Sequence, residues 1–417
     1  MKALARPRPR GPIVAVDVGT TKTCCFIARA DEGQLQILGI GHQASHGMRA
    51  GTILDMETVT TSITNAVDAA EKMLGDRIRD IFVNVSGGQP TSRMVTVDMA
   101  LSGREIDDGD VRRLHEHGRS MVEPGDRHLL HSIPTSYIVD GNRGIRDPRG
   151  MYGERLGVQV HTITTAASVV RNLVLCAHKA QLEIEGLVSS PFAAGLACLV
   201  EDEMDLGVTV VDMGGGTTSM AVFFDGKVVL TDMVPIGGAH VTSDIARGLS
   251  TPTVHAERMK TLYGSCIGSP ADERETIMVP QVGEEDDGQG NQVPKSFLVD
   301  IIRPRMEETF ELVRARLEAS GLDKIAGRRV VLTGGASQLP GARELAGQVL
   351  DKQTRLGRPI RIAGLAEAAG GPAFSVCAGL LHYAVVQRAE EATTVRATRA
   401  SQKGYFGRFG AWLKENF

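Results

Sequence analysis

Apolar residues in this chain gather in short runs, and stretches with helical spacing separate the runs. The first run, residues 13–28, has the pattern of two strands with a turn between them, and Leu35–Ile40 adds a third strand. From Met56 to Leu74 apolar residues recur every three or four positions, which predicts a helix before the next strand at Ile81–Val85. This order of strands, helix and strand predicts the start of an α/β unit.

A second unit of the same kind begins about 195 residues after the first. Val208–Asp212 and Met220–Phe224 are another pair of predicted strands with a turn between them. Val330–Gly341 holds a later strand and a turn into a helix, with Pro340 near the helix start. The repeat predicts a duplicated domain with a cleft between its two halves.

The pattern changes after Gly87–Pro90, a glycine- and proline-containing boundary. Short strands and one helix, Asp110–Met121, then predict an inserted subdomain. The polar segment Ser269–Ser296 predicts a loop or a long hairpin. Helical spacing also occurs at Ser168–Leu182, at Val254–Gly264, from Ile302 to Leu317 with Pro304 in the first turn, and at Ala373–Val386.

Each of the two strand-to-strand turns follows an aspartate and is rich in glycine and threonine. Glycine lets phosphate oxygens approach backbone N–H groups, and an aspartate can hold Mg²⁺ through water. One glycine cluster after a strand is more often only a tight turn, but a second copy favours a phosphate site. The candidate phosphate-binding residues are Gly19, Thr20, Thr21, Lys22, Gly214, Gly215, Gly216, Thr217 and Thr218, and the candidate Mg²⁺ residues are Asp17 and Asp212.

Composition narrows the classes of function. The 417 residues are 42% apolar and carry a net charge of −4, which gives little electrostatic support to nucleic-acid binding. The six cysteines form no CxxC pair, so we expect buried free thiols, and His128 and His131 fit a structural role better than a metal site. No apolar run is long enough to span a membrane. Residues 1–11 lack the apolar region of a signal peptide and predict a disordered basic tail.

The pair of turns matches neither a Walker A nor a Rossmann glycine motif, and it resembles the two phosphate loops of the actin-like ATPase superfamily. That resemblance implies an α/β fold of duplicated RNase H-like halves around a nucleotide cleft, with ATP and Mg²⁺ as cofactors. Glu257 and Lys260 resemble an element that FtsA and MreB place beside the ribose and adenine, although a solvated ion pair is the alternative. The segment from Val330 resembles the adenosine loop, which implies contacts from Gly334, Gly335 and Ala336.

A longer segment, His131–Thr165, resembles the end of the subdomain that is peculiar to the FtsA family. One departure is Ser86–Pro90, where FtsA proteins usually have a Ser-Gly-x-His-type sequence, so a contact that depends on that histidine is not carried over. The resemblance implies that Arg305 binds the acidic, apolar C-terminal tail of FtsZ, although arginines beside a helix are more often solvated. The residues that match the family segment are Ile145, Pro148, Gly150, Met151, Arg155, Leu156 and His161.

The sequence offers no clear catalytic base. In actin relatives the segment before the second phosphate hairpin crosses the cleft and can supply the residue that positions the attacking water. Here that segment, Leu187–Val200, contains no Asp, Glu or Gln. We therefore assign no catalytic residue and expect at most a weak ATPase, in which the nucleotide acts mainly as a conformational ligand.

The chain ends in a flexible polar linker, 390–402, and an aromatic segment, 403–417. On a helix the large apolar residues of this segment fall within an arc of about 140°, with basic residues near its edges. This pattern predicts an amphipathic helix on an anionic membrane surface, and docking into the protein's own core or a partner's groove is the alternative. The expected membrane-binding residues are Tyr405, Phe406, Phe409, Trp412, Leu413 and Phe417.

Nearly the whole chain resembles FtsA, which implies an actin-like cell division protein. Such a protein forms filaments, tethers FtsZ to the cytoplasmic face of the cell membrane at the septum as a peripheral protein, and recruits later divisome proteins. A metabolic sugar or acid kinase of the same superfamily and a PilM-like cytoplasmic ATP-binding scaffold are the alternatives. The expected units are a tail (1–11), a first half (12–86, completed by 163–190 and 370–389), the inserted subdomain (87–162), a second half (191–247, completed by 323–369), an FtsZ-binding small subdomain (248–322), the linker and the membrane helix.

Overall fold

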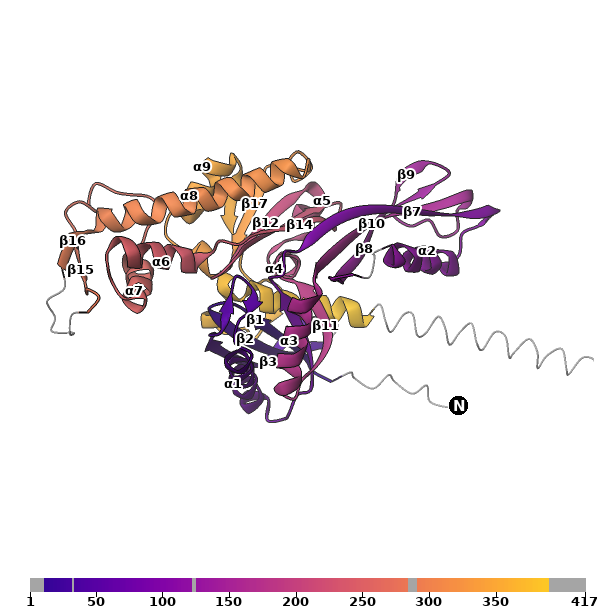
Figure 1. The fold of residues 1–417 in the computed structure, drawn as a ribbon. Helices are drawn as coiled ribbons and strands as arrows, with labels where there is room; N and C mark the ends of the chain where they lie inside the picture. Colours follow the sequence, from indigo (N-terminus) through magenta and orange to yellow (C-terminus); the bar gives the residue numbers. More distant parts are fainter. Residues whose placement is uncertain (1–10, 32–33, 122–124, 284–290, 390–417) are drawn as a thin grey trace, which may run out of the picture.

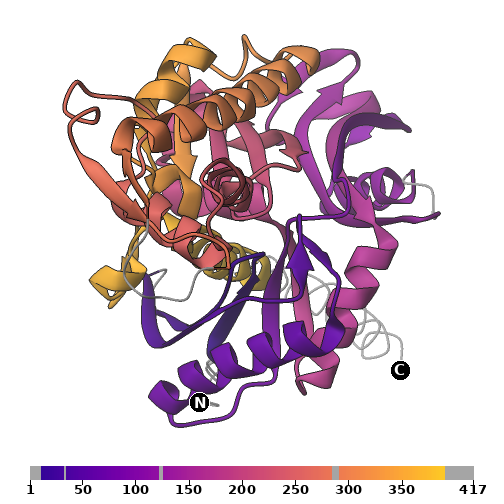
Figure 2. The ribbon, with the colours of Figure 1, turned by 60° about the vertical axis from the view of Figure 1, so that its left-hand side comes forward.

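The computed structural model describes residues 11–31, 34–121, 125–283 and 291–389. A six-stranded sheet in the order β11-β6-β1-β2-β3-β19 forms the first half. Helices α1 (Met56–Leu74) and α3 (Ala167–Lys179) pack on one face of this sheet (Figures 1 and 2). The strands are β1 (Ile13–Val18), β2 (Lys22–Asp31), β3 (Gln34–Ala44), β6 (Asp80–Val85), β11 (Glu183–Ser189) and β19 (Ile362–Ala363).

A five-stranded sheet in the order β14-β13-β12-β17-β18 forms the second half. Strand β12 is antiparallel to β13 and parallel to β17, and β1 has the same relation to β2 and β6. The order β3-β2-β1-β6-β11 is thus repeated, which confirms the predicted duplicated α/β fold. The elements are β12 (Val208–Met213), β13 (Thr218–Phe224), β14 (Lys227–Val234), β17 (Arg329–Thr333) and β18 (Gln353–Leu356), with α8 (Lys295–Ala319) and α9 (Ala342–Leu350) on one face.

Local signals set the ends of α1 where the sequence predicts them. The Asp55 carboxylate accepts hydrogen bonds from the backbone N–H groups of Glu57 and Thr58, at 3.0 and 3.3 Å, and so caps the first turn. Gly75 ends the helix with a φ of 79°, a conformation that glycine adopts without steric cost. Apolar spacing and caps therefore agree over the whole element.

Two helices lie between the sheets and join the halves. Helix α4 (Ser190–Cys198) follows β11 directly, and a helix over residues 375–389 ends the described chain. Ala193 of α4 and Cys377 of the last helix belong to the same buried cluster as Phe26 of the first sheet and Phe223 of the second. In Figure 1 the last helix, in yellow, lies between the two sheets. Movement of one half against the other must therefore be accommodated at these two helices.

The insertion forms a separate four-stranded sheet in the order β7-β10-β8-β9, with α2 (Asp108–Ser120) packed on it. Asp107 and Asp110 form a capping box at the start of α2, close to the predicted helix start. The sheet reaches the second half, where the Thr231 N–H donates to Ser92 Oγ at 3.2 Å. The strands are β7 (Thr91–Glu105), β8 (Arg127–Val139), β9 (Asn142–Ile145) and β10 (Tyr152–Ala166).

A smaller group of elements lies beside the second half, at the left of Figure 1. It consists of α6 (Gly238–Gly248), α7 (Thr253–Tyr263), β15 (Thr276–Val279), β16 (Asn291–Pro294) and the first turns of α8. Strands β15 and β16 pair antiparallel, so the predicted long hairpin is confirmed for the described residues of 269–296.

The prediction that Pro304 lies in the first turn of its helix is wrong. Helix α8 begins at Lys295, with Pro294 as its N-cap, and Pro304 lies inside it. The buried side chains of Leu298 and Val299 extend the apolar face toward the N-terminus, and their burial outweighs the backbone hydrogen bond that Pro304 cannot make. The prediction placed the start of the helix too late because proline is common in the first turn of a helix.

The remaining elements are short: β4 (Met48–Arg49), β5 (Thr52–Ile53), α5 (Glu201–Leu206) and the 3₁₀ helices η1 (Gly335–Gln338), η2 (Glu367–Ala369) and η3 (Pro372–Phe374). All six cysteines are free and buried, as predicted. Among the helices that the structure describes, none has both the length and the apolar character needed to cross a membrane. The predicted N-terminal tail up to residue 10, the linker and the amphipathic segment lie outside the described residues.

Gly379 lies where the last helix crosses α4, and an added Cβ would lie 1.7 Å from Ala193 O. Alanine is a better helix former than glycine by about 1 kcal/mol, but overpacking costs about 1–3 kcal/mol and occasionally more. We expect Gly379→Ala to lower the free energy of unfolding by about 1–3 kcal/mol in urea denaturation. Gly268→Ala, whose added Cβ would meet only Val299 Cγ1 at 3.7 Å, is the control. Unchanged or higher stability of Gly379→Ala would contradict the close crossing.

Candidate functional site

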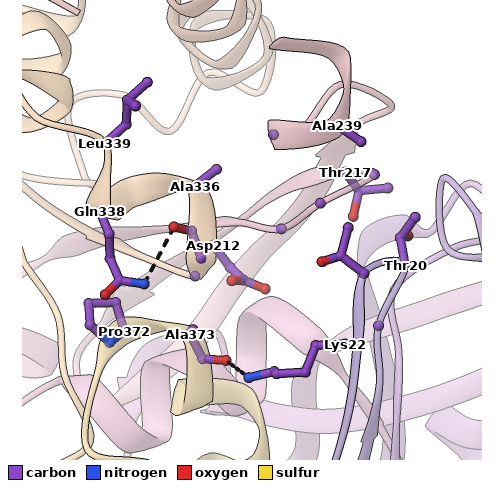
Figure 3. A pocket seen from close by; sticks show the side chains of 18 of the residues that line it. Thr20, Lys22, Asp212, Thr217, Ala239, Ala336, Gln338, Leu339, Pro372 and Ala373 are labelled. Atoms are coloured by element: carbon purple, nitrogen blue, oxygen red, sulfur yellow. Dashed lines mark hydrogen bonds between the residues drawn. The ribbon is translucent and has the colours of Figure 1, made fainter. Parts of the chain in front are cut away.

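A cavity of about 450 Å³ lies between the two halves, at the tips of the β1–β2 and β12–β13 hairpins (Figure 3). Of the predicted site residues near this cleft, only Thr218 does not line it, because its side chain is buried and its hydroxyl donates to Ile236 O at 2.8 Å. The predicted residues that line the cavity are Asp17, Gly19, Thr20, Thr21, Lys22, Asp212, Gly214, Gly215, Gly216, Thr217, Glu257, Lys260, Gly334, Gly335 and Ala336.

The two hairpin turns have the same backbone geometry. Gly19 N donates to Lys22 O at 3.0 Å, and Gly214 N donates to Thr217 O at 2.9 Å. Asp17 and Asp212 each occupy the position before the last residue of their strand, so each carboxylate comes just before its turn. Burial of the strand residues fixes that position, and duplication places the two aspartates on opposite sides of the same cavity.

The glycines of the second turn allow the two hairpin tips to approach each other. A Cβ added to Gly215 would lie 2.4 Å from Thr21 Cγ2, and one added to Gly216 would lie 2.6 Å from Thr20 Oγ1. Side chains at these positions would therefore push the halves apart. Glycine serves here to close the cleft as well as to expose backbone N–H groups to its interior.

The two aspartates are buried without the full solvation that a carboxylate needs. Burial raises the pKa of Asp17 to about 6, although nearby Lys22 lowers it. Burial also raises the pKa of Asp212 to about 7, and the charge of Asp17 raises it further while Lys22 opposes the rise. The cavity therefore holds two carboxylates that are unfavourable as a pair of anions. A cation between or beside them would relieve this cost.

Lys22 is held against the segment that precedes the last helix. Its ammonium donates a hydrogen bond to Ala373 O and lies 3.5 Å from the centre of the Phe374 ring. Figure 3 shows the side chain reaching across the floor of the cavity to Ala373. The first hairpin is thus in contact with the helix that runs between the two sheets.

Gly334, which lies beside Asp212 in the cavity, is required by its conformation and by its neighbours. Its φ is 83°, and an added Cβ would lie 2.5 Å from both Asp212 Oδ1 and Met213 O. Gly334 is followed directly by η1, which places Ala336, Gln338 and Leu339 along one side of the cavity (Figure 3). This close approach of backbone to carboxylate is what the glycine pair after β17 permits.

A network of polar side chains on α6 and α7 forms another part of the lining. Lys260 Nζ donates to Gly238 O at 3.1 Å and to Thr242 Oγ1 at 2.8 Å, and it pairs with Glu257 Oε2 at 2.7 Å. The predicted ion pair on α7 therefore exists, and it also lines the cavity. The ion pair is anchored to α6 by Lys260 and also lines the cleft, and the predicted contact with a nucleotide stays a prediction.

Five polar residues of the cavity were missed from the sequence: Asn84, Ser86, Ser190, Thr261 and Gln338. Asn84, at the end of β6, accepts from Val18 N at 2.7 Å and donates to Ser190 Oγ at 3.1 Å, and Ser86 follows it. The available signal was a single amide inside the apolar strand Ile81–Val85 and a serine pair inside the otherwise apolar 187–200 segment. Polar residues at such positions indicate a site at the strand end.

The described lining contains no acid beyond Asp17, Asp212 and Glu257. In the described part of the chain no group of three or more His, Cys, Asp or Glu side chains has the arrangement of a metal site. His131, which the sequence assigned a structural role, accepts from Ser189 N at 3.0 Å with its Nε2. The cavity thus provides three carboxylates, two lysine ammonium groups, hydroxyls, two side-chain amides and backbone N–H groups.

Arg305 lies outside this cavity, on α8. Its Nε donates to Asp244 Oδ2 at 2.5 Å, its Nη2 donates to Asp244 Oδ1 at 3.3 Å, and its Nη1 pairs with Glu308. The guanidinium is therefore already bound to two carboxylates of the same chain.

The fold defines an actin-like protein with an inserted subdomain. The chain is similar to a structure of the PilM–PilN type IV pilus biogenesis complex, with 18% identity, coverage of 89% of this chain and 98% of that chain, and a TM-score of 0.64. It is also similar to MreB5 of Spiroplasma citri bound to ADP, with 12% identity, coverage of 93% and 99%, and a TM-score of 0.54. These similarities concern the fold.

Sequence comparison then identifies the family. The family model "Cell division protein FtsA" matches residues 209–379, and the model "SHS2 domain inserted in FTSA" matches residues 87–164. The chain is 44% identical to the FtsA protein of Agrobacterium fabrum over 98% of its length and 96% of the relative. It is 31% identical to that of Escherichia coli K12, with coverage of 97% and 98%. The chain belongs to the FtsA family of cell division proteins, as the sequence motifs predicted.

The raised pKa of Asp212 predicts a stability penalty without ligand. A carboxyl whose pKa is about 7 in the folded state and about 3.8 in the unfolded state lowers the stability of the fold progressively as pH rises from about 3.8 to about 7, and the full penalty persists above pH 7. We expect Asp212→Asn, without nucleotide or Mg²⁺, to melt several degrees above wild type at pH 8, with a smaller difference at pH 5.5. Thermal unfolding followed by circular dichroism measures this.

Asp80→Asn removes an exposed carboxylate at the start of β6 and is the matched control. A melting temperature of Asp212→Asn that is lower than wild type, or a difference that does not change with pH, would contradict the electrostatic description.

Proposed function

We propose that the cleft binds ATP with Mg²⁺. In this proposal the turns Gly19–Lys22 and Gly214–Thr217 hold the phosphates with backbone N–H groups, hydroxyls and the Lys22 ammonium. Thr218, whose side chain points away, contributes only through its backbone. Asp17 and Asp212 order Mg²⁺ through water. The cation neutralises part of the negative charge of the two carboxylates and the polyphosphate. The observation that carries the proposal is the pair of buried carboxylates with raised pKa values between two glycine-rich hairpins.

The adenosine end of the proposed site is the part of the lining that follows β17 and the part on α7. Gly334, Gly335 and Ala336 leave room for a base against the backbone, and Glu257 and Lys260 offer polar groups to a ribose. Two structures with a similar fold, both of Spiroplasma citri MreB5, are described as bound to ADP and to AMPPNP. They support the placement of a nucleotide in the corresponding cleft of this chain.

The proposed role of the nucleotide is conformational. The described lining has hydroxyls and side-chain amides, but no third carboxylate near the hairpin tips that could serve as a general base. A ligand that contacts both hairpins favours one angle between the halves, because α4 and the last helix are the connection between them. We propose that this angle permits self-association into filaments and that hydrolysis is slow.

The family function is cell division, and we propose the finer roles that its members imply. Arg305 binds the acidic tail of FtsZ in the 248–322 subdomain, and the 87–162 subdomain recruits later divisome proteins. The segment 403–417 binds the anionic cytoplasmic face of the membrane at the septum as a peripheral anchor. Its six large apolar residues, from Tyr405 to Phe417, insert together, and several copies on one filament bind far more tightly than one.

Two alternatives remain distinguishable by experiment. A metabolic kinase would show turnover that depends on a small acceptor in a coupled assay, and it would need a carboxylate base that the cavity does not offer near the hairpins. A PilM-like scaffold would stay at the membrane after deletion of 403–417, through a partner. Membership of the FtsA family favours neither alternative.

Mg-ATP binding is expected to tighten as pH rises from 6 to 8. The proposed site needs both carboxylates ionised, and their pKa values are about 6 and about 7 without ligand. We expect a gain in affinity of at least about tenfold over this range, measured with a fluorescent ATP analogue. Asp212→Asn is expected to weaken binding and to remove most of the pH dependence, leaving that of Asp17 and of the nucleotide's own phosphate. An equal pH dependence in both proteins would contradict the role of Asp212.

The single tryptophan, Trp412, tests the membrane anchor. Titration of the protein with anionic vesicles is expected to shift Trp412 emission to the blue, because the indole leaves water. The shift should strengthen with Mg-ATP, since filaments present many tails at once. Vesicles of neutral lipid are the control, because they lack the negative charge that attracts the basic residues of the segment. Absence of a shift with and without Mg-ATP would contradict the anchor while leaving the cleft assignment intact.

A further inference from the structure

The guanidinium of Arg305 is engaged within the chain. Asp244, on α6, accepts from Arg305 Nε at 2.5 Å and from Nη2 at 3.3 Å, a two-point contact, and Glu308 pairs with Nη1. The side chains of Arg305 and Asp244 are only 27% and 23% exposed. Because this ion pair is largely removed from water and is held by two hydrogen bonds, it is stronger than an exposed surface ion pair.

An acidic segment that binds Arg305 must therefore replace an existing carboxylate. Arginine has a planar fork of donors, and the edge formed by Nε and Nη2 is the one that fits a carboxylate at two points. Asp244 occupies that edge. If it stayed in place, Asp244 and Glu308 would also repel an incoming aspartate or glutamate.

The following inference rests on the proposed role of Arg305 in binding an acidic tail. We propose that Asp244 is an intramolecular competitor for this tail, and that a nucleotide in the cleft weakens the competitor. The Asp244–Arg305 pair then links the nucleotide site to capture of the acidic partner.

The two partners of the pair lie on helices that both line the nucleotide cavity. Val241, one turn before Asp244 on α6, and Met306, next to Arg305 on α8, belong to the cavity lining. Helices α6 and α8 also pack on each other. A base and ribose placed against Val241 and Met306 would lie between these helices and move them apart. The Nε–Nη2 edge of Arg305 would then be free to bind a carboxylate of the acidic partner.

Helix α6 is also attached to the second phosphate hairpin. Gly238 N donates to Gly214 O at 2.9 Å, and Ala239 N donates to Gly215 O at 2.8 Å. Asp244 follows Ala239 by five residues, which spans about 7.5 Å along a helix. A short helix is stiff over this length, so a shift of the hairpin on phosphate binding reaches Asp244 directly.

The test measures binding of a fluorescein-labelled peptide with the sequence of the FtsZ C-terminal tail to the full chain by anisotropy, at fixed ionic strength, with and without Mg-ATP. For the wild type we expect Mg-ATP to tighten binding about threefold or more. Asp244→Asn is expected to bind about five- to tenfold more tightly than wild type without nucleotide, and to respond little to Mg-ATP. Glu308 is more exposed than Asp244 and pairs only with Nη1 of Arg305, so Glu308→Gln is expected to give a smaller increase in affinity for the peptide.

Two further variants separate the inference from the function on which it rests. Glu311→Gln removes one exposed negative charge from α8 without touching Arg305, and it is expected to leave binding close to wild type. Arg305→Gln is expected to weaken binding at least tenfold. If Arg305→Gln has no effect, the proposed role of Arg305 fails. Suppose that Arg305→Gln weakens binding, but that Asp244→Asn and Glu308→Gln bind the peptide no more tightly than Glu311→Gln does. The proposal that Asp244 competes with the tail is then overturned, and the proposed role of Arg305 stands. An equal response to Mg-ATP in wild type and Asp244→Asn overturns the link to the cleft.

Discussion

Two carboxylates that share one buried cavity are the constraint on which the rest of this structure depends. Asp17 and Asp212 come from separate halves of a duplicated fold, and burial together with the charge of Asp17 keeps the pKa of Asp212 near 7. Their cost to the empty protein is what the proposed Mg²⁺ and nucleotide would relieve on entering the cleft. The glycines of the hairpin tips have the same purpose, because any side chain at Gly215 or Gly216 would hold the halves apart.

The core connects that cavity to the rest of the molecule. Helix α4 and the helix 375–389 contact both sheets, and Gly379 lets them cross in direct backbone contact. Lys22 rests on Ala373 and Phe374, just before the last helix, while the second hairpin is bonded to the start of α6. Each glycine-rich hairpin therefore contacts a different helical segment. The first contacts the residues just before the helix 375–389, and the second is hydrogen-bonded to α6, which carries Asp244. A single ligand can influence both.

Much of this arrangement was predictable from the sequence because the signals are local or repeated. Helix α1 was found to the residue from its apolar spacing, and the Asp55 and Gly75 caps seen in the structure end it at the same positions. The duplicated hairpins and the glycines after β17 gave the part of the cavity around Asp17 and Asp212. The start of α8 was misplaced because burial of Leu298 depends on tertiary packing, which can accommodate a proline within a helix. Asn84 and Ser190 were missed although each is a polar residue in an otherwise apolar segment, and Asp244 was missed because nothing near it in the chain shows that it faces Arg305. The orientation of Thr218 away from the cavity follows from the alternation of side chains along β13, which a composition-based reading of the turn overlooks.

The central claim is that one nucleotide is held by both hairpins at once, and titration calorimetry with Mg-ATP tests it most directly. We predict one ATP per chain for the wild type. Lys22→Ala, in the first hairpin, and Thr217→Ala, in the second, should each weaken binding several-fold or more without changing the stoichiometry, and the double variant should bind barely at all. Contradiction would come from a variant of one hairpin that abolishes binding while the variant of the other binds ATP as tightly as wild type, because the nucleotide would then occupy one half of the molecule alone.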